Sequence, residues 1–65
     1  MITEHTRLIN CFIGLTKKDP TFPQELRNKD LQYSIDLIEP HFRNSEGKEI
    51  NADLLLNSRK LYLSQ

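Results

Sequence analysis

Sixty-five residues suffice for one small domain, and a chain of this length buries only about 60% of the surface it exposes when unfolded. Nine basic and nine acidic residues cancel, and each third of the chain carries both signs in similar numbers. This pattern lacks the basic patch of a nucleic-acid or membrane-surface binder, and no apolar run approaches the ~18 residues of a membrane span. We therefore expect one soluble helical domain over residues 1–65.

Cys11 is the only cysteine, so no disulfide can form within the chain. A single cysteine, with no secretory signal at the N-terminus, favours a reducing, cytoplasmic setting. The initial Met1 and a full set of helix caps favour a complete small protein with no further domain. Below roughly 70–80 residues a single core seldom supplies more than about 3–5 kcal/mol, and small chains often add a partner.

The first predicted helix covers about residues 3–16. Thr3 suits the N-cap, Glu4 suits the positive end of the helix dipole, and lysines follow at the other end. Gly14 costs a helix roughly 1 kcal/mol relative to Ala, which indicates either a close helix crossing or a helix that ends nearby. The apolar face predicted from the helical wheel consists of His5, Leu8, Ile9, Phe12, Ile13, Leu15 and Thr16.

A break follows the first helix, because Pro20 and Pro23 each favour an extended residue before them. Phe22 in this break is expected to pack between the first and second helices. Thr21 and Gln24 have the spacing of a capping box, which predicts the start of the second helix.

The second predicted helix covers about residues 23–39, with a kink or a short extra turn at Pro40. Phe42 continues the apolar pattern beyond that proline. In an alternative, Asp30 caps a new helix and the segment splits near Asn28. The apolar residues fall in two rows that span more than half of the helix circumference, namely Leu31, Ile35, Ile38 and Phe42, and Leu26, Tyr33 and Leu37.

Residues 43–49 form a polar loop in which Gly47 can take a positive φ. The third predicted helix covers about residues 51–63, with Asn51 as N-cap and Asp53 in the first turn. Its expected core face consists of Ile50, Leu54, Leu55, Leu61 and Tyr62.

These elements predict an all-α fold, a bundle of three helices near residues 3–16, 23–39 and 51–63. The wide apolar face of the middle helix requires both neighbours to cover it. An alternative with a strand over residues 60–63 is disfavoured because no partner strand is evident. The side chains expected at the centre of the core are Phe12, Leu31, Ile35, Ile38 and Leu54.

No residue pattern indicates catalysis or metal binding. Cys11 and His5 are six positions apart on different parts of one helix, which does not pair a nucleophile with a base. His41 has no second ligand at metal-binding spacing. Asp36 and Glu39 lie on the polar side of the second helix, where carboxylates are solvated rather than paired. We expect no enzyme activity, no catalytic residues, no metal and no cofactor.

The last helix carries a second apolar stripe. Leu56 and Leu63 lie seven residues apart beside Ala52 and Arg59, away from the expected core face. Either the two leucines close a small core, or they form a contact surface. We favour the second possibility and predict a non-enzymatic protein–protein interaction module, an adaptor or regulator that forms a weak homodimer and binds another protein.

The alternative function is a small DNA-binding regulator of the helix-turn-helix type. It rests on three helices separated by short breaks. The last helix would supply the groove contacts, but Asp53 and five leucines dilute its polar face. Nucleic acid and membranes are therefore not expected partners. The polar residues that this helix offers to a groove are Asn51, Asn57, Ser58, Arg59 and Lys60.

Overall fold

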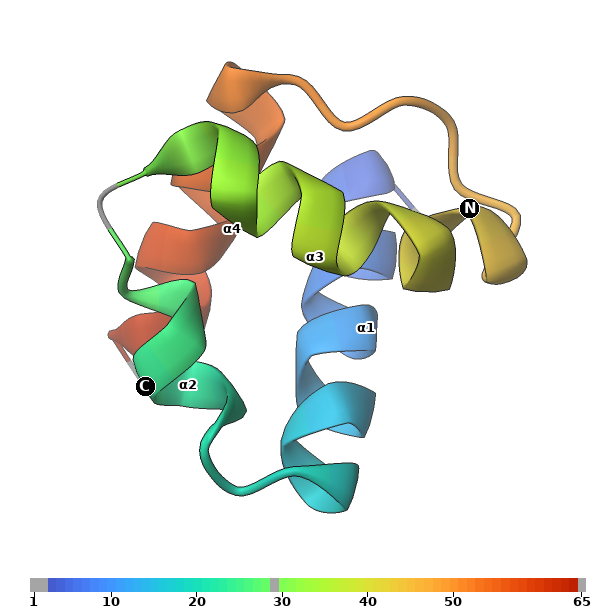
Figure 1. Ribbon diagram of the computed structural model, residues 1–65. Helices are drawn as coiled ribbons and strands as arrows, with labels where there is room; N and C mark the ends of the chain where they lie inside the picture. The colour runs from blue at the N-terminus through green and yellow to red at the C-terminus, as the bar shows by residue number, and fades with distance from the viewer. Residues whose placement is uncertain (1–2, 29, 65) are drawn as a thin grey trace.

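The computed structural model describes residues 3–28 and 30–64. Within these residues all regular secondary structure is helical, without strands, and no helix is both long enough and apolar enough to cross a membrane. The all-α prediction is confirmed, and residues 60–63 are helical. The four helices, seen in Figure 1, are α1 (Glu4–Lys18), α2 (Phe22–Leu26), α3 (Leu31–Asn44) and α4 (Ala52–Leu63).

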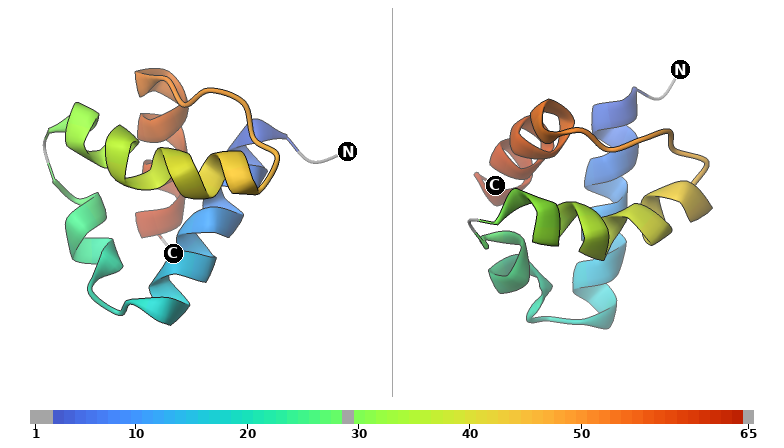
Figure 2. Two further views of the ribbon diagram at one scale, coloured as in Figure 1. Left: turned by 45° about the vertical axis from the view of Figure 1, so that its right-hand side comes forward. Right: turned by 45° about the horizontal axis from the view of Figure 1, so that its top comes forward.

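Helices α1 and α4 lie side by side and run in the same direction, while α3 crosses both (Figures 1 and 2). Hydrogen bonds join α1 to α4 and to the loop that precedes α4. The Lys48 N–H donates to the Glu4 carboxylate at 3.2 Å, and the Thr16 and Tyr62 hydroxyls bond to each other further along. The short α2 joins the end of α1 to the start of α3.

The core lies where all four helices meet, and Phe12 is its centre. The Phe12 ring is fully buried, with its centroid 6.0 Å from that of Phe22 and 5.4 Å from that of Tyr62. Phe22 thus packs against α1, as predicted, but it begins α2 instead of lying in the break before it. Of the expected central side chains, Phe12, Ile38 and Leu54 are buried, and Leu31 and Ile35 are partly buried at the margin.

The prediction of one helix over residues 23–39 is wrong, and the alternative split near Asn28 is confirmed. Asp30 caps a new helix, since its Oδ1 accepts the N–H groups of Gln32 at 3.0 Å and Tyr33 at 3.2 Å. Just before it, the Asn28 side chain accepts the Asp30 N–H at 2.8 Å. Short polar side chains satisfy the backbone here in place of helical hydrogen bonds.

Pro40 lies inside α3, which continues to Asn44. A proline in a helix interior costs about 3 kcal/mol, because it removes a backbone hydrogen bond and crowds the preceding turn. Burial of Phe42, which has no exposed surface, offsets part of this cost. The predicted extension past Pro40 is therefore present, as continued helix.

Two of the predicted N-caps are confirmed, and the capping box is wrong. The Thr3 and Asn51 side chains accept the N–H groups of the third residue beyond them, Thr6 and Leu54, at 3.1 and 2.8 Å. Thr21 precedes α2 but makes no such bond. Its hydroxyl donates to Asp19 Oδ1 at 2.6 Å, a closer acceptor on the preceding turn.

The positive φ predicted for Gly47 occurs one residue earlier, at Glu46, with φ of 67°. The N–H of Gly47 donates to the Phe42 carbonyl at 2.9 Å, and the N–H of Glu46 donates to the Arg43 carbonyl at 3.0 Å. This pair of bonds is the Schellman motif, whose left-handed residue is usually glycine. Glycine stands at the following position because a Cβ there would lie 2.6 Å from the Phe42 ring.

The helix faces are rotated from those expected. His5 and Ile13 are exposed, and Leu61, at 53%, is the most exposed large apolar side chain within residues 3–28 and 30–64. The predicted core positions of these three residues are wrong. Cys11 and Ser58 are buried in their place. The core side of α1 turns toward Cys11 because α3 crosses there, and the small Ser58 lets α4 pack closely.

Both explanations offered for Gly14 are wrong. The helix continues to Lys18, and an added Cβ at Gly14 would meet nothing within 4 Å. We expect Gly14→Ala to raise the free energy of unfolding by about 0.5–1 kcal/mol, because alanine loses less backbone entropy in a helix. Denaturant titration measures this change, and a loss of stability would contradict the open space around Gly14.

Candidate functional site

The stripe predicted as an interface lies on the outer side of α4. Leu56 is 40% exposed and Ala52 is exposed, whereas Leu63 and Arg59 are half-buried. The stripe therefore offers solvent an apolar surface in its first half and a partly covered one in its second half. The interface itself stays a prediction, and within the stripe the Leu56 side chain is accessible to a partner.

Arg59 has a role within the chain that the sequence did not indicate. Its guanidinium donates to the carbonyl oxygens of Leu26 at 3.2 Å and Asn28 at 3.1 Å. These carbonyls lie at the end of α2, where the helix leaves acceptors unpaired. Arg59 thus joins α4 to the connection between α2 and α3 by hydrogen bonds. The stripe, which includes Arg59, lies beside that connection.

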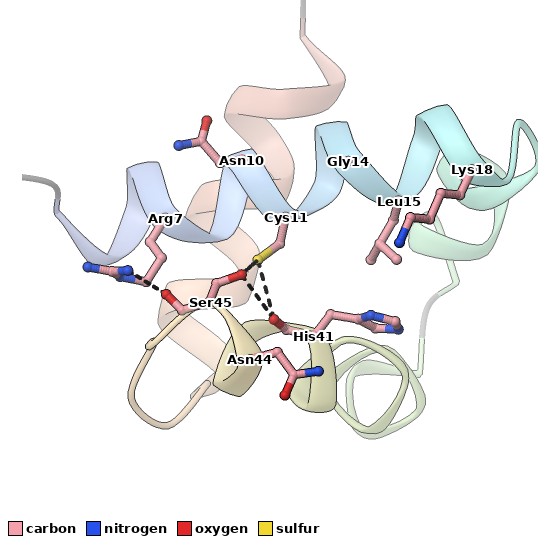
Figure 3. A pocket seen from close by; sticks show the side chains of 9 residues that line it. All are labelled: Arg7, Asn10, Cys11, Gly14, Leu15, Lys18, His41, Asn44 and Ser45. Atoms are coloured by element: carbon pink, nitrogen blue, oxygen red, sulfur yellow. Dashed lines mark hydrogen bonds between the residues drawn. The ribbon is translucent and has the colours of Figure 1, made fainter.

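A second surface feature is a groove of about 400 Å³ between α1 and the last two turns of α3 (Figure 3). Helix α1 contributes a basic residue at each end, Arg7 and Lys18, and α3 contributes His41. The bare backbone of Gly14 forms part of its wall. Its lining residues are Arg7, Asn10, Cys11, Gly14, Leu15, Lys18, His41, Asn44 and Ser45.

Polar contacts at the N-terminal end of the groove join the two helices. The Arg7 guanidinium donates to the Ser45 carbonyl and lies 3.9 Å from the Glu4 carboxylate. Cys11 Sγ lies 3.2 Å from the Ser45 hydroxyl and 3.8 Å from the His41 carbonyl oxygen. Cys11 is 9% exposed and meets the His41 backbone, while the imidazole points toward the other end of the groove (Figure 3).

Sequence reasoning missed this groove, although part of its pattern is visible in the sequence. Arg7, Cys11, Leu15 and Lys18 fall at i, i+4, i+8 and i+11, so one stripe of α1 is basic at both ends and small or apolar between. What the pattern does not reveal is that α3 crosses beside this stripe and supplies His41.

Residues 4–63 match the MJECL32 domain. The chain belongs to the MJECL32 domain family. No curated protein and no solved structure matches it.

The MJECL32 match begins at the first residue of α1 and ends at the last residue of α4. The match therefore spans all four helices of this chain.

Two exposed side chains in this MJECL32 domain have shifted pKa values that follow from local hydrogen bonds. The pKa of Asp19 is lowered because the Thr21 hydroxyl donates to its carboxylate, and the Thr21 N–H donates as well with a smaller effect. The pKa of Tyr33 is raised because its hydroxyl donates to the Glu25 carboxylate at 2.6 Å, whose negative charge also disfavours ionisation. The bond between Tyr33 and Glu25 joins α3 to α2, and the bonds between Thr21 and Asp19 lie within the turn before α2. Both sets of bonds help to position these connections.

Proposed function

We propose that this chain is a non-enzymatic interaction module that self-associates through the outer stripe of α4. The observation that carries the proposal is the exposure of Leu56, at 40%, in line with Ala52 and the half-buried Leu63. The proposed partner at this surface is a second copy of the chain. A further protein bound by the dimer remains part of the proposal, as an adaptor or regulator requires.

A two-fold contact suits the stripe. In an antiparallel pair of α4 helices, Leu56 of each copy meets Leu63 of the other, and the same patch serves both copies. Full burial of a leucine is worth about 1.5–3 kcal/mol, and less than half of that remains to be gained at a side chain already 60% covered. Association itself costs on the order of 4–15 kcal/mol, which equals or exceeds this gain, so any dimer is weak and concentration-dependent.

DNA binding receives less support from the same helix. Of the five polar residues that α4 offers to a groove, Ser58 has no exposed surface and Arg59 donates to two backbone carbonyls. Asn51 accepts the N–H of Leu54 as an N-cap. This leaves Asn57 and Lys60, which supply one positive charge, whereas phosphate binding depends on several.

We expect Leu56→Glu combined with Leu63→Glu to give a folded monomer, because two carboxylates per copy would be desolvated in the contact. Sedimentation equilibrium at high micromolar concentration measures the mass, and circular dichroism reports folding. Leu61→Glu is the matched control for Leu56→Glu alone, because it places one carboxylate on another side of α4, and it should leave the mass of the dimer unchanged.

A monomeric native chain at high micromolar concentration would refute self-association. An equal loss of mass with Leu61→Glu would refute this stripe as its site. Because Leu63 is half-buried, Leu56→Glu alone serves as a second variant, and it should also dissociate the dimer without unfolding the chain.

A further inference from the structure

The groove between α1 and α3 continues into a second hollow of about 150 Å³ toward the end of α1. The two hollows share Leu15, Lys18 and His41, so these residues stand at their junction. Figure 3 shows the Lys18 side chain running back beside Leu15, with the His41 ring turned toward the same end of the groove.

The second hollow has an apolar wall. Leu15 and Leu37 are half-buried there, and Phe22, which is 4% exposed, forms its inner side. In another protein an apolar cavity of about 150 Å³ takes up benzene. The hollow therefore has room for one aromatic ring or a short branched aliphatic group.

The Lys18 ammonium brings a positive charge to the junction and makes no direct ion pair within residues 3–28 and 30–64. Neither the Lys18 ammonium nor the His41 ring makes a hydrogen bond or ion pair within residues 3–28 and 30–64, which places both free for a ligand. Asp19 also lines the second hollow and contributes a negative charge there, with its Oδ1 held by two hydrogen bonds from Thr21. Arg7, at the far end, is engaged by the Ser45 carbonyl.

We propose that this groove binds a small organic acid, one that carries a carboxylate on an apolar group. The apolar group enters the second hollow against Leu15, Phe22 and Leu37. The carboxylate lies at the junction, where Lys18 donates to it and the His41 ring supplies a further donor. The larger hollow, at about 400 Å³, is within the range of small-molecule sites and leaves space for the rest of the ligand.

The test is a two-dimensional amide NMR titration of the full chain with 3-phenylpropanoate at millimolar concentrations. Saturable shifts are expected along the second half of α1 and the second half of α3. Two probes separate the contributions: 3-phenylpropanol keeps the ring without the charge, and acetate keeps the charge without the ring. Each should bind at least five-fold more weakly than 3-phenylpropanoate.

Lys18→Gln should weaken binding of 3-phenylpropanoate at least five-fold. The matched control is Lys17→Gln, which removes the same charge at an exposed neighbour outside both hollows and should change the affinity less than two-fold. Absence of shifts, equal binding of 3-phenylpropanol, or an equal loss with Lys17→Gln would each overturn the proposal. The amide spectrum itself shows whether each variant is folded.

Discussion

Phe12→Ala is expected to abolish cooperative unfolding of this chain. The Phe12 ring has no exposed surface and packs against both Phe22 and Tyr62, so its truncation removes the contact that joins α1 to α2 and α4. A buried phenylalanine replaced by alanine costs about 3–5 kcal/mol. A core of this size supplies about the same amount in total. Far-UV circular dichroism during heating should therefore show no folded baseline at 25 °C.

The control for this variant is the next residue along the chain. Ile13 is 39% exposed, so Ile13→Ala should lower the free energy of unfolding by less than about 1 kcal/mol. If Phe12→Ala instead melts cooperatively within a few degrees of the native chain, Phe12 is not at the centre of the core. A larger loss at Ile13 than at Phe12 would place the core on the other side of α1.

Gly47→Ala is expected to lower the free energy of unfolding by about 1–3 kcal/mol, the usual cost of overpacking a filled core. The added Cβ would lie 2.6 Å from three atoms of the Phe42 ring, which has no exposed surface and no free space to turn into. The Gly47 N–H is also bonded to the Phe42 carbonyl, which holds the two residues together. For a domain of this size the loss corresponds to a melting temperature lower by about 4–8 °C per kcal/mol.

The matched control is the preceding position. Glu46 has a φ of 67°, a conformation that glycine takes without strain. Glu46→Gly should therefore leave stability unchanged or raise it by about 0.5–1 kcal/mol, despite the added entropy of the unfolded chain. If Gly47→Ala were neutral and Glu46→Gly strongly destabilising, the close packing on Phe42 and the left-handed residue would both be wrongly assigned.

Local interactions made much of this fold predictable. Thr3 and Asn51 accept N–H groups three residues ahead, a short-range bond that depends on residue type and position alone. The apolar spacing likewise located α1 and α4. Asp30 is the same kind of cap. The apolar residues before and after it nevertheless favour one continuous helix, so only the alternative prediction, a split near Asn28, contains the break between α2 and α3.

Features set by packing were not predictable in the same way. The rotation of α1 that buries Cys11 and exposes Ile13 depends on where α3 crosses, which the helical wheel does not contain. The turn after α3 was predicted with its positive φ at Gly47, because the sequence does not show that the Phe42 ring occupies the space of a Cβ there. The groove was missed for a similar reason, since His41 lies 23 residues from Lys18 in the sequence and reaches it only in the fold.

The proposed self-association through α4 is tested most directly by amide and methyl NMR spectra of the native chain at low and high micromolar concentrations. We expect concentration-dependent shifts centred on Leu56 and Leu63, and the chain that carries both Leu56→Glu and Leu63→Glu should no longer show them. Spectra that do not change with concentration would contradict it. Shifts centred on the groove between α1 and α3 would also contradict it, because they would place the contact on another face of the molecule.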